Sequence, residues 1–321
     1  MRMSSRLFMK QALQKPGALE KSNPLKTNSL SSSLSMRLEK NDFKSRRGMM
    51  VTDLDGTLLT SERTVSDADL ETLRELGRQG IPRVIATGRS LFSFKRTEGL
   101  QLPIDYVIFS TGAGILRVSD GRIFRDINLD PEMVSLAMDA LRKVSLDFMV
   151  HLPVPDNHRF SYRCGKVENH DFTRRIELYK DVCCPLDGNG EAFGPAAQLL
   201  AIVPPSKSLQ VIEDLRKNLP ALNVIRTTSP LDGKSTWIEI FHRNVSKGLA
   251  AEWLSAELGI PKRLTLSVGN DFNDLDLLEW AGTSFVVGNA PDALKEKYAA
   301  VASHNHNGVT EAVSRWLENL E

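Results

Sequence analysis

The sequence predicts an α/β protein, in which a doubly wound parallel sheet is interrupted by an inserted α+β unit. Two observations predict this class. From residue 49 onward, short apolar runs alternate with amphipathic helical stretches, which is the pattern of βαβ units in a parallel sheet. This pattern stops in the middle of the chain and returns near its end. We therefore assign residues 49–127 and 243–321 to the sheet domain and residues 128–242 to the insertion.

The first half of the sheet is predicted from three apolar runs: MMV (49–51), IPRVIA (81–86) and YVIFS (106–110). Between the first two runs lies SDADLETLRELGRQG, in which Leu70, Leu73 and Leu76 fall on one face of a helix. Ser66 is well placed as the N-cap of that helix.

The second half is predicted from two buried strands, at 264–269 and 284–288, and from three helices at about 247–258, 290–299 and 309–320. The insertion differs from both halves. It combines the helix-like PEMVSLAMDALRK, the polar stretch HLPVPDNHRFSYRCG, another helix at about 169–180 and several further apolar strands. That mixture is typical of a compact α+β unit.

Residues 1–48 have a different composition from the rest of the chain. They contain nine serines and eleven Lys or Arg against three acidic residues, without sustained apolar periodicity. This composition predicts a disordered basic tail. It is also the composition of a transit peptide, and a third interpretation is that translation begins at Met49 or Met50. We exclude the tail from the fold prediction.

Charge and hydropathy narrow the class of protein. Residues 49–321 carry 30 Lys or Arg against 37 Asp or Glu, and such an acidic body argues against nucleic acid as the main partner. No stretch reaches the eighteen or so uncharged apolar residues that span a bilayer. Cys164, Cys183 and Cys184 show no disulfide or zinc spacing, which favours a reducing compartment, and we expect a cytoplasmic protein.

VTDLDGT (51–57) places two carboxylates one residue apart, directly after a buried run. Two like charges at this spacing repel each other unless a cation lies beside them. Because ligands of an open parallel sheet bind outside the carboxyl ends of its strands, Asp53 is expected to face such a crevice. Asp53 and Asp55 together can neutralise a hard cation such as Mg²⁺, and an aspartate is an established nucleophile towards phosphorus. Gly56 and Thr57 let the backbone turn away from the site.

Three further stretches are expected to lie at the same crevice, because two of them follow buried strands and the third begins a helix. ATGR (86–89) offers the Thr87 hydroxyl and the Gly88 backbone N–H to a phosphate oxygen. VSKG opens a helix and places Lys247 in its first turn, where a cation opposes the helix dipole and therefore indicates an anionic target. SVGNDFNDLDLL (267–278) ends another buried run with four Asn or Asp residues within five positions.

DLDGT, TGR, a helix-opening SKG and GNDFND, in this order, resemble the haloacid dehalogenase-like (HAD) superfamily of phosphatases. The domain inserted between the second and third motifs is similar to the cap of the Cof-type branch, subfamily IIB, which is a C2-type α/β domain. The resemblance covers roughly residues 49–321. It implies a Rossmann-like core and a magnesium-dependent phosphatase that hydrolyses a small phosphorylated metabolite through an aspartyl-phosphate.

The resemblance also implies a role for each matching residue. Asp53 is the nucleophile, and Asp55 protonates the leaving alkoxide and then activates the hydrolytic water. The implied catalytic residues are Asp53, Asp55, Thr87 and Lys247. The implied phosphate-binding residues are Thr87, Gly88, Lys247 and Asn273. The implied metal ligands are Asp53, Asp55, Asn270 and Asp274, of which Asp274 also supports Lys247.

The fourth motif departs from the common Gly-Asp-x-x-Asn-Asp form of the family. Asn270 occupies the position of the usual metal-binding acid, and Asp271 is an additional acid. An amide oxygen can still bind Mg²⁺ but contributes no charge. Either residue can complete the metal site, and we favour Asn270 because it keeps the spacing to Asn273 and Asp274. A smaller departure is STGAG (110–114), where the family often has Asn before Gly-Ala.

The cap of this family selects the leaving group. Candidate contacts are polar or aromatic residues of the insertion: His151, Asn157, His158, Arg159, Arg163, Lys234 and Trp237. They predict a polar, hydroxylated or anionic substrate such as a sugar phosphate. Two alternatives stay open. One is a phosphomannomutase-like phosphotransferase, which passes the phosphoryl group to a second sugar, and the other is a non-catalytic relative with a weakened metal site at Asn270.

Overall fold

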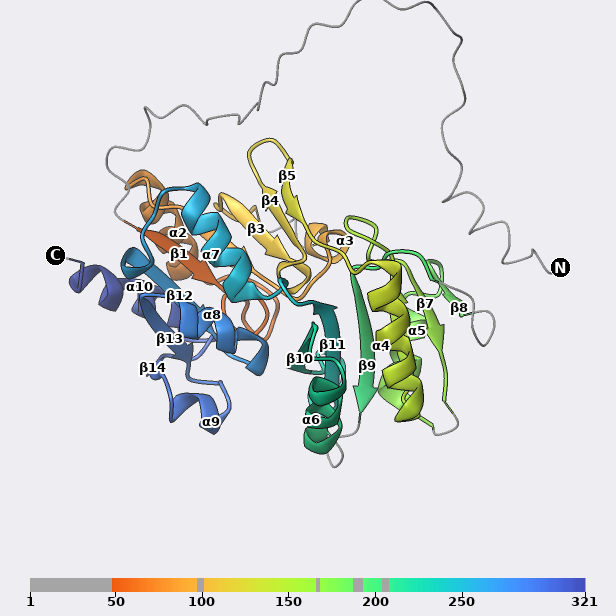
Figure 1. Ribbon diagram of the computed structural model, residues 1–321. Helices are drawn as coiled ribbons and strands as arrows, with labels where there is room; N and C mark the ends of the chain where they lie inside the picture. Colours follow the sequence, from red (N-terminus) through yellow and green to blue (C-terminus); the bar gives the residue numbers. More distant parts are fainter. Residues whose placement is uncertain (1–47, 97–100, 166–167, 187–192, 204–207, 321) are drawn as a thin grey trace, which may run out of the picture. The chain divides into compact units, whose positions relative to one another are not determined.

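The computed structural model describes residues 48–96, 101–165, 168–186, 193–203 and 208–320 (Figure 1). Apart from Gly48, the predicted tail lies outside the described residues. Within the described ranges, no helix is long and apolar enough to cross a membrane.

Among the described residues, eight strands form the larger sheet, in the order β14-β13-β12-β1-β2-β3-β4-β5. Their bounds are β1 (Met49–Thr52), β2 (Arg83–Ala86), β3 (Tyr106–Phe109), β4 (Gly114–Arg117), β5 (Ile123–Asp126), β12 (Thr265–Gly269), β13 (Thr283–Val287) and β14 (Ala299–Val301). The strands from β14 to β3 are parallel. The sheet grows in opposite directions on the two sides of β1, so the carboxyl end of β1 is a topological switch point. The predicted α/β class with a parallel sheet is confirmed.

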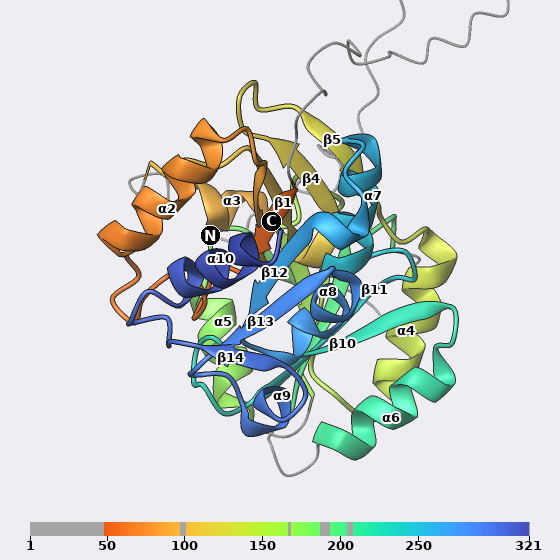
Figure 2. The ribbon, with the colours of Figure 1, turned by 90° about the vertical axis from the view of Figure 1, so that its left-hand side faces the viewer.

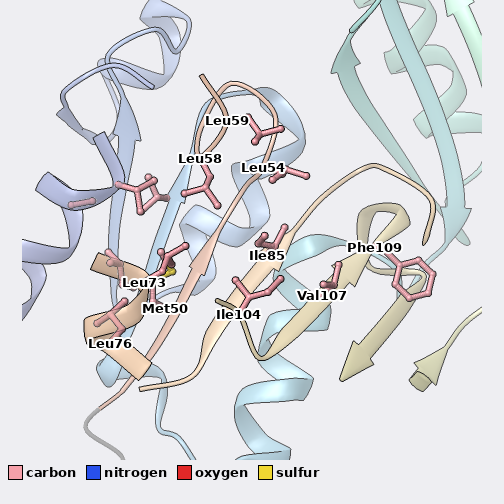
Figure 3. Packing of buried hydrophobic residues seen from close by; sticks show 14 of the residues in the cluster. Met50, Leu54, Leu58, Leu59, Leu73, Leu76, Ile85, Ile104, Val107 and Phe109 are labelled. Atoms are coloured by element: carbon pink, nitrogen blue, oxygen red, sulfur yellow. The ribbon is translucent and has the colours of Figure 1, made fainter. Parts of the chain in front are cut away.

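Helices cover both faces of this sheet (Figure 2). Helices α2 (Asp67–Arg78) and α10 (Gly308–Glu318) share one hydrophobic cluster with Met50 of β1. Figure 3 shows Met50 beside Leu73 and Leu76 of α2. The neighbouring residues of β1 point the other way and pack against α7 (Lys247–Glu257) and α8 (Leu275–Trp280). Strand β1 is therefore buried on both faces, which explains its uninterrupted apolar sequence.

Helix α2 begins where the sequence predicts. The Ser66 side chain accepts a hydrogen bond from the backbone N–H of Asp69, which caps the helix. Asp69 has no exposed surface, and its carboxylate accepts hydrogen bonds from the Ser66 hydroxyl and from both the backbone N–H and the hydroxyl of Thr310. This carboxylate therefore joins the start of α2 to α10.

Two parts of the sheet domain differ from the prediction. The helix predicted over residues 290–299 is shorter, because α9 covers only Asp292–Lys295 and β14 pairs with β13 from residue 299 onward. At the opposite edge, β4 and β5 extend the sheet as an antiparallel hairpin that the sequence did not predict. A short α3 (Leu91–Lys95) follows β2.

The second sheet contains six strands from the described part of the insertion, in the order β10-β11-β9-β6-β7-β8. Their bounds are β6 (Phe148–His151), β7 (Phe160–Arg163), β8 (Cys183–Pro185), β9 (Gln198–Val203), β10 (Leu222–Thr228) and β11 (Thr236–His242). Helices α4 (Pro131–Lys143) and α6 (Ser208–Asn218) cover one face. Helix α5 (His170–Leu178) packs on the other face through Phe172. We refer to this sheet and its helices as the cap.

Replacing the buried Asp69 by Ala should lower the free energy of unfolding by about 2–4 kcal/mol, because it leaves the partly buried donors of Thr310 without an acceptor. Urea unfolding measures the change. Asp67→Ala is the control, since Asp67 is an exposed acid in the same first turn and should cost less than about 1 kcal/mol. Equal losses for the two variants would contradict the role given to Asp69.

Candidate active site

Asp53 directly follows β1 and is only 5% exposed. Its Oδ1 accepts a hydrogen bond from Nζ of Lys247 at 2.7 Å. Lys247 begins α7 and has no exposed surface, and its Nζ also donates to Oδ1 of Asp274 at 2.6 Å. A buried ammonium is strongly unfavourable unless it is paired. Three of the sequence motifs therefore meet at one buried cation.

The pKa values of both Asp53 and Lys247 are raised in this cluster, for different reasons. Burial raises the pKa of Asp53 to about 7, although the attraction of Lys247 lowers it, and Asp274 raises it further. Burial by itself would lower the pKa of Lys247, but Asp274 and Asp53 together raise it above its ordinary value. Lys247 is therefore a permanent positive charge beside Asp53.

Asp274 is fully engaged by the protein. Its Oδ1 accepts from Lys247, and its Oδ2 accepts from the backbone N–H groups of Asn270 and Asp271 at 2.8 and 3.1 Å. Asp274 has no exposed surface. The geometry therefore places it as the partner of Lys247 and as the support of its own loop, and not as the metal ligand that the sequence also suggested.

Asp271, the alternative metal ligand, faces the cap. Its carboxylate accepts hydrogen bonds from the backbone N–H of Thr228 at 2.9 Å and from the Thr228 hydroxyl at 3.1 Å. Thr228 is the last residue of β10, and Asp271 also caps its own loop by accepting from the N–H of Phe272 at 2.8 Å. The extra acid of the fourth motif is thus a tether between this loop and the cap.

Asn270 points towards the carboxylate pair. One end of its amide lies 3.2 Å from Oδ2 of Asp53, 3.2 Å from the carbonyl oxygen of Asp55 and 3.0 Å from the Thr57 hydroxyl. With nitrogen at this end, the amide donates to those oxygens. With oxygen at this end, Thr57 donates to it, and the oxygens of Asp53, Asp55 and Asn270 converge on one another. A cation held between Asp53, Asp55 and Asn270 would stabilise that second arrangement.

The spacing of these oxygens fits magnesium. Neighbouring ligands of an octahedral Mg²⁺ with bonds of about 2.1 Å are about 3.0 Å apart. The set consists of one carboxylate, one backbone carbonyl and one amide. The described residues accordingly contain no metal-holding group of three or more His, Cys, Asp or Glu. Gly56 makes room for the amide, since a Cβ there would lie 2.9 Å from Nδ2 of Asn270.

The Asp55 side chain forms a bidentate ion pair with Arg89. Nε and Nη2 of Arg89 donate to the two carboxylate oxygens at 2.7 and 2.5 Å. Both residues line the same cavity as Asp53. Arg89 is the last residue of ATGR, and sequence reasoning gave it no role although the motif displays it. The pair holds the Asp55 carboxylate at the edge of the site.

The residues predicted to bind the phosphoryl group lie together. Thr87 follows β2, is 1% exposed, and its Oγ1 accepts from the N–H of Arg89 at 3.1 Å. A Cβ on Gly88 would lie 3.6 Å from Oγ1 of Thr111 and 3.8 Å from Nδ2 of Asn273. Glycine at this position therefore leaves an opening between a hydroxyl and an amide, next to the buried Thr87.

A cavity of about 1160 Å³ lies between these loops and the cap. Its lining combines Asp53 and Asp55 with residues of β6, α5, β9 and β11. The two sides also touch directly. Asn157 donates to the Ser110 hydroxyl at 2.7 Å, and the Thr111 hydroxyl donates to Glu239 at 3.3 Å. The cavity is therefore closed on one side by the cap.

The cavity lining tests which predicted cap residues reach the site. His151, Asn157, His158 and Trp237 line it, whereas Arg159, Arg163 and Lys234 do not. Sequence reasoning missed a second group of lining residues: Arg175, Tyr179, Gln198, Thr227 and Glu239. Part of this group was visible in TWIEIF, because alternation along a strand puts Trp237 and Glu239 on one face.

A family model for haloacid dehalogenase-like hydrolases matches residues 50–313. The chain therefore belongs to the haloacid dehalogenase-like hydrolase family. A putative phosphatase of Haemophilus influenzae is 27% identical over 260 residues, which cover 80% of this chain and 93% of the relative. The 5-amino-6-(5-phospho-D-ribitylamino)uracil phosphatase of Bacillus subtilis is 26% identical over 286 residues, which cover 88% of this chain and 100% of the relative.

Solved structures of the superfamily have the same fold. A sugar phosphatase of HAD subclass IIB is 17% identical and superposes with a TM-score of 0.65, covering 85% of this chain and 100% of that chain. The predicted membership in the phosphatases of this superfamily, and in its Cof-type branch, is confirmed.

The metal site can be tested at its neutral ligand. Asn270→Asp should tighten Mg²⁺ binding about tenfold or more, because the converging oxygens then gain a full charge. A magnesium titration followed by intrinsic fluorescence and by activity measures it. Asp271→Asn is the matched control, since Asp271 is committed to Thr228 and should leave magnesium affinity unchanged. A loss of magnesium affinity in Asp271→Asn would instead identify Asp271 as the metal ligand.

Proposed function

We propose that the protein is a Mg²⁺-dependent phosphatase that hydrolyses a small phosphorylated metabolite, such as a sugar phosphate, through an aspartyl-phosphate on Asp53. One observation carries the proposal. The two oxygens of Asp53 have different surroundings, since Oδ1 is held by the buried Lys247 and Oδ2 lies beside the Asp55 carbonyl and the Asn270 amide. A carboxylate between a fixed cation and a cation-binding set is arranged for attack on an anionic phosphorus centre.

The chemistry proceeds in two displacements. An oxygen of Asp53 attacks phosphorus, and the bond from phosphorus to the ester oxygen breaks as Asp55 gives that oxygen a proton. The Asp55 carboxylate then takes a proton from water, which attacks phosphorus and releases Asp53 and inorganic phosphate. Lys247 offsets the charge on Asp53 and on the phosphoryl group. Bound Mg²⁺ would be held by Asp53, Asp55 and Asn270, and would neutralise phosphate charge.

Thr87, Gly88 and Asn273 support the same proposal from the phosphate side. They line the cavity next to Asp53 and offer a hydroxyl, a backbone N–H and an amide. One relative is a phosphatase of a phosphoribityl compound and one solved structure is a sugar phosphatase, so we would screen phosphate esters with hydroxylated leaving groups first. Phosphate release should therefore be measured over sugar phosphates, polyol phosphates, nucleotides and phosphorylated ribityl compounds. Isomerised product from a sugar bisphosphate, without free phosphate, would instead favour the phosphotransferase alternative.

A cytoplasmic location is part of the proposal. All three cysteines carry free thiols, with Cys164 exposed and Cys183 and Cys184 partly buried. Such thiols persist in a reducing compartment.

Asp53→Asn should abolish phosphate release while leaving the fold intact, because an amide is a poor nucleophile. Its far-ultraviolet circular dichroism and melting curve serve as the control for folding. Turnover at the parental rate would refute the covalent mechanism.

Asp55→Asn should reduce kcat about 10²–10⁴-fold for alkyl phosphates, because the leaving alkoxide then lacks a proton donor. The loss should be smaller for p-nitrophenyl phosphate, whose leaving group needs no proton. An equal loss for both substrates would argue against an acid role for Asp55.

A further inference from the structure

The cap-sheet face that lines the cavity carries a set of polar side chains. The sheet register places His151 opposite Gln198 and Thr227 opposite Trp237. Glu239 follows Trp237 by two residues on β11 and therefore points to the same face. All of these residues line the cavity. His151, Gln198 and Glu239 are each at most 5% exposed. The rest of this face is apolar and packs against α5. A polar patch has thus been kept inside an otherwise hydrophobic layer.

Several atoms of this patch are buried without a hydrogen-bond partner: His151 Nε2, Asn157 Oδ1, Arg175 Nε and Thr227 Oγ1. Unpaired buried polar atoms are unfavourable, and they indicate places where a ligand or water supplies the partner. Because these four residues line the cavity that holds Asp53, the missing partner belongs to the occupant of that cavity.

Most of these atoms accept hydrogen bonds. Nδ1 of His151 lies 2.7 Å from the carbonyl oxygen of Asn157, so the ring donates there and leaves Nε2 as an acceptor. Burial lowers the pKa of His151 to about 3, which keeps the ring neutral. Asn157 uses its amide nitrogen on Ser110, so its oxygen is also an acceptor. An anionic group placed here would be unfavourable, because these atoms are acceptors and cannot donate a hydrogen bond to it.

Arg175 supplies the donor. Its guanidinium lies over the rings of Trp237 at 4.5 Å, Tyr179 at 5.1 Å and Phe160 at 5.8 Å from their centroids. Trp237 is itself fixed, because its Nε1 donates to Asp171 at 2.7 Å. The described residues place no carboxylate within 4.0 Å of Arg175. The guanidinium is therefore held in place by aromatic rings while its Nε lacks a partner.

Glu239 connects the cap to the segment that contains Thr111. One of its carboxylate oxygens accepts from the hydroxyl of Thr111, and Thr111 in turn is next to the opening left by Gly88. The backbone N–H of Thr111 also donates to the carbonyl of Thr87 at 3.0 Å. A substrate in this cavity thus meets the carboxylate of Glu239.

We propose that Arg175 and Glu239, with His151 and Asn157, form a hydroxyl-reading subsite, so that the substrate is the phosphate ester of a neutral polyol or sugar. A hydroxyl both donates and accepts, and it can therefore satisfy Arg175 and the surrounding acceptors together. A carboxylate or second phosphate can use only the donor, and it would be repelled by Glu239. This inference rests on the proposed phosphatase activity and specifies its leaving group.

The test compares sorbitol 6-phosphate with 6-phosphogluconate, which carries a carboxylate in place of the terminal CH₂OH. The parent should favour the polyol in kcat/KM by about tenfold or more. Arg175→Gln should lower kcat/KM for sorbitol 6-phosphate by about 10–100-fold relative to p-nitrophenyl phosphate, which has no hydroxyls. Glu239→Gln should bring the polyol-to-acid ratio towards one, because it removes the repulsive charge and keeps the shape.

Arg142→Gln is the matched control, since it removes the same charge from α4, on the opposite face of the cap sheet. It should leave both ratios unchanged. If Arg142→Gln changed the kcat/KM ratios as much as Arg175→Gln, the effect of Arg175 would be explained by net charge alone. That result would overturn the subsite. An equal or better rate with 6-phosphogluconate in the parent would overturn it as well, while the phosphatase proposal would stand.

A binding measurement separates the two proposals. Calorimetry on Asp53→Asn should show tighter binding of sorbitol 6-phosphate than of 6-phosphogluconate, and Arg175→Gln in that background should weaken the polyol ester about 10–100-fold. If the parent hydrolyses no ester but this preference is found, the phosphatase proposal fails and the subsite holds. If esters are hydrolysed but the two ligands bind equally, the subsite fails.

Discussion

The buried ammonium of Lys247 is the interaction on which the rest of the site depends. Its Nζ lies between Asp53 and Asp274, and neither the lysine nor Asp274 has any exposed surface. Removing one partner of such a buried pair costs about 3–5 kcal/mol, because an uncompensated charge stays behind. The end of β1, the start of α7 and the loop after β12 are therefore held in one arrangement. The position of Asp53 is set by this constraint.

The cap is attached to the same loops by hydrogen bonds. Three residues of the cap make these bonds. Thr228 donates to Asp271, Asn157 donates to Ser110, and Glu239 accepts from Thr111. Ser110 and Thr111 adopt φ values of 50° and 56°, which residues other than glycine and asparagine rarely adopt. We infer that this strained turn is tolerated because its two hydroxyls hold the cap. The hydroxyl-reading subsite and the phosphate-binding site that we propose would then share one short segment.

Much of the fold follows from local patterns that a single sequence displays. The strands β1, β2, β3, β12 and β13 are apolar because they are buried, and Ser66 caps α2 as its position predicts. The motif residues lie at strand ends, so the sheet brings Asp53, Thr87 and the loop after β12 together. The hairpin β4–β5 escaped prediction because edge strands are half-exposed. Arg175 escaped because its contacts with aromatic rings join separate elements of the cap.

Asn270 and Asp271 show how one loop divides two tasks. The family's usual arrangement has an acid at the first position, whereas here the amide of Asn270 faces Asp53 and the charge is displaced to Asp271, which binds the cap. The backbone N–H groups of both residues donate to the same oxygen of Asp274, which fixes the backbone from which the two side chains project. Less charge at the metal position weakens the attraction for a cation. The loop that carries this amide also binds the cap through Asp271 and Thr228, so the extra acid has a structural task that is separate from the metal position.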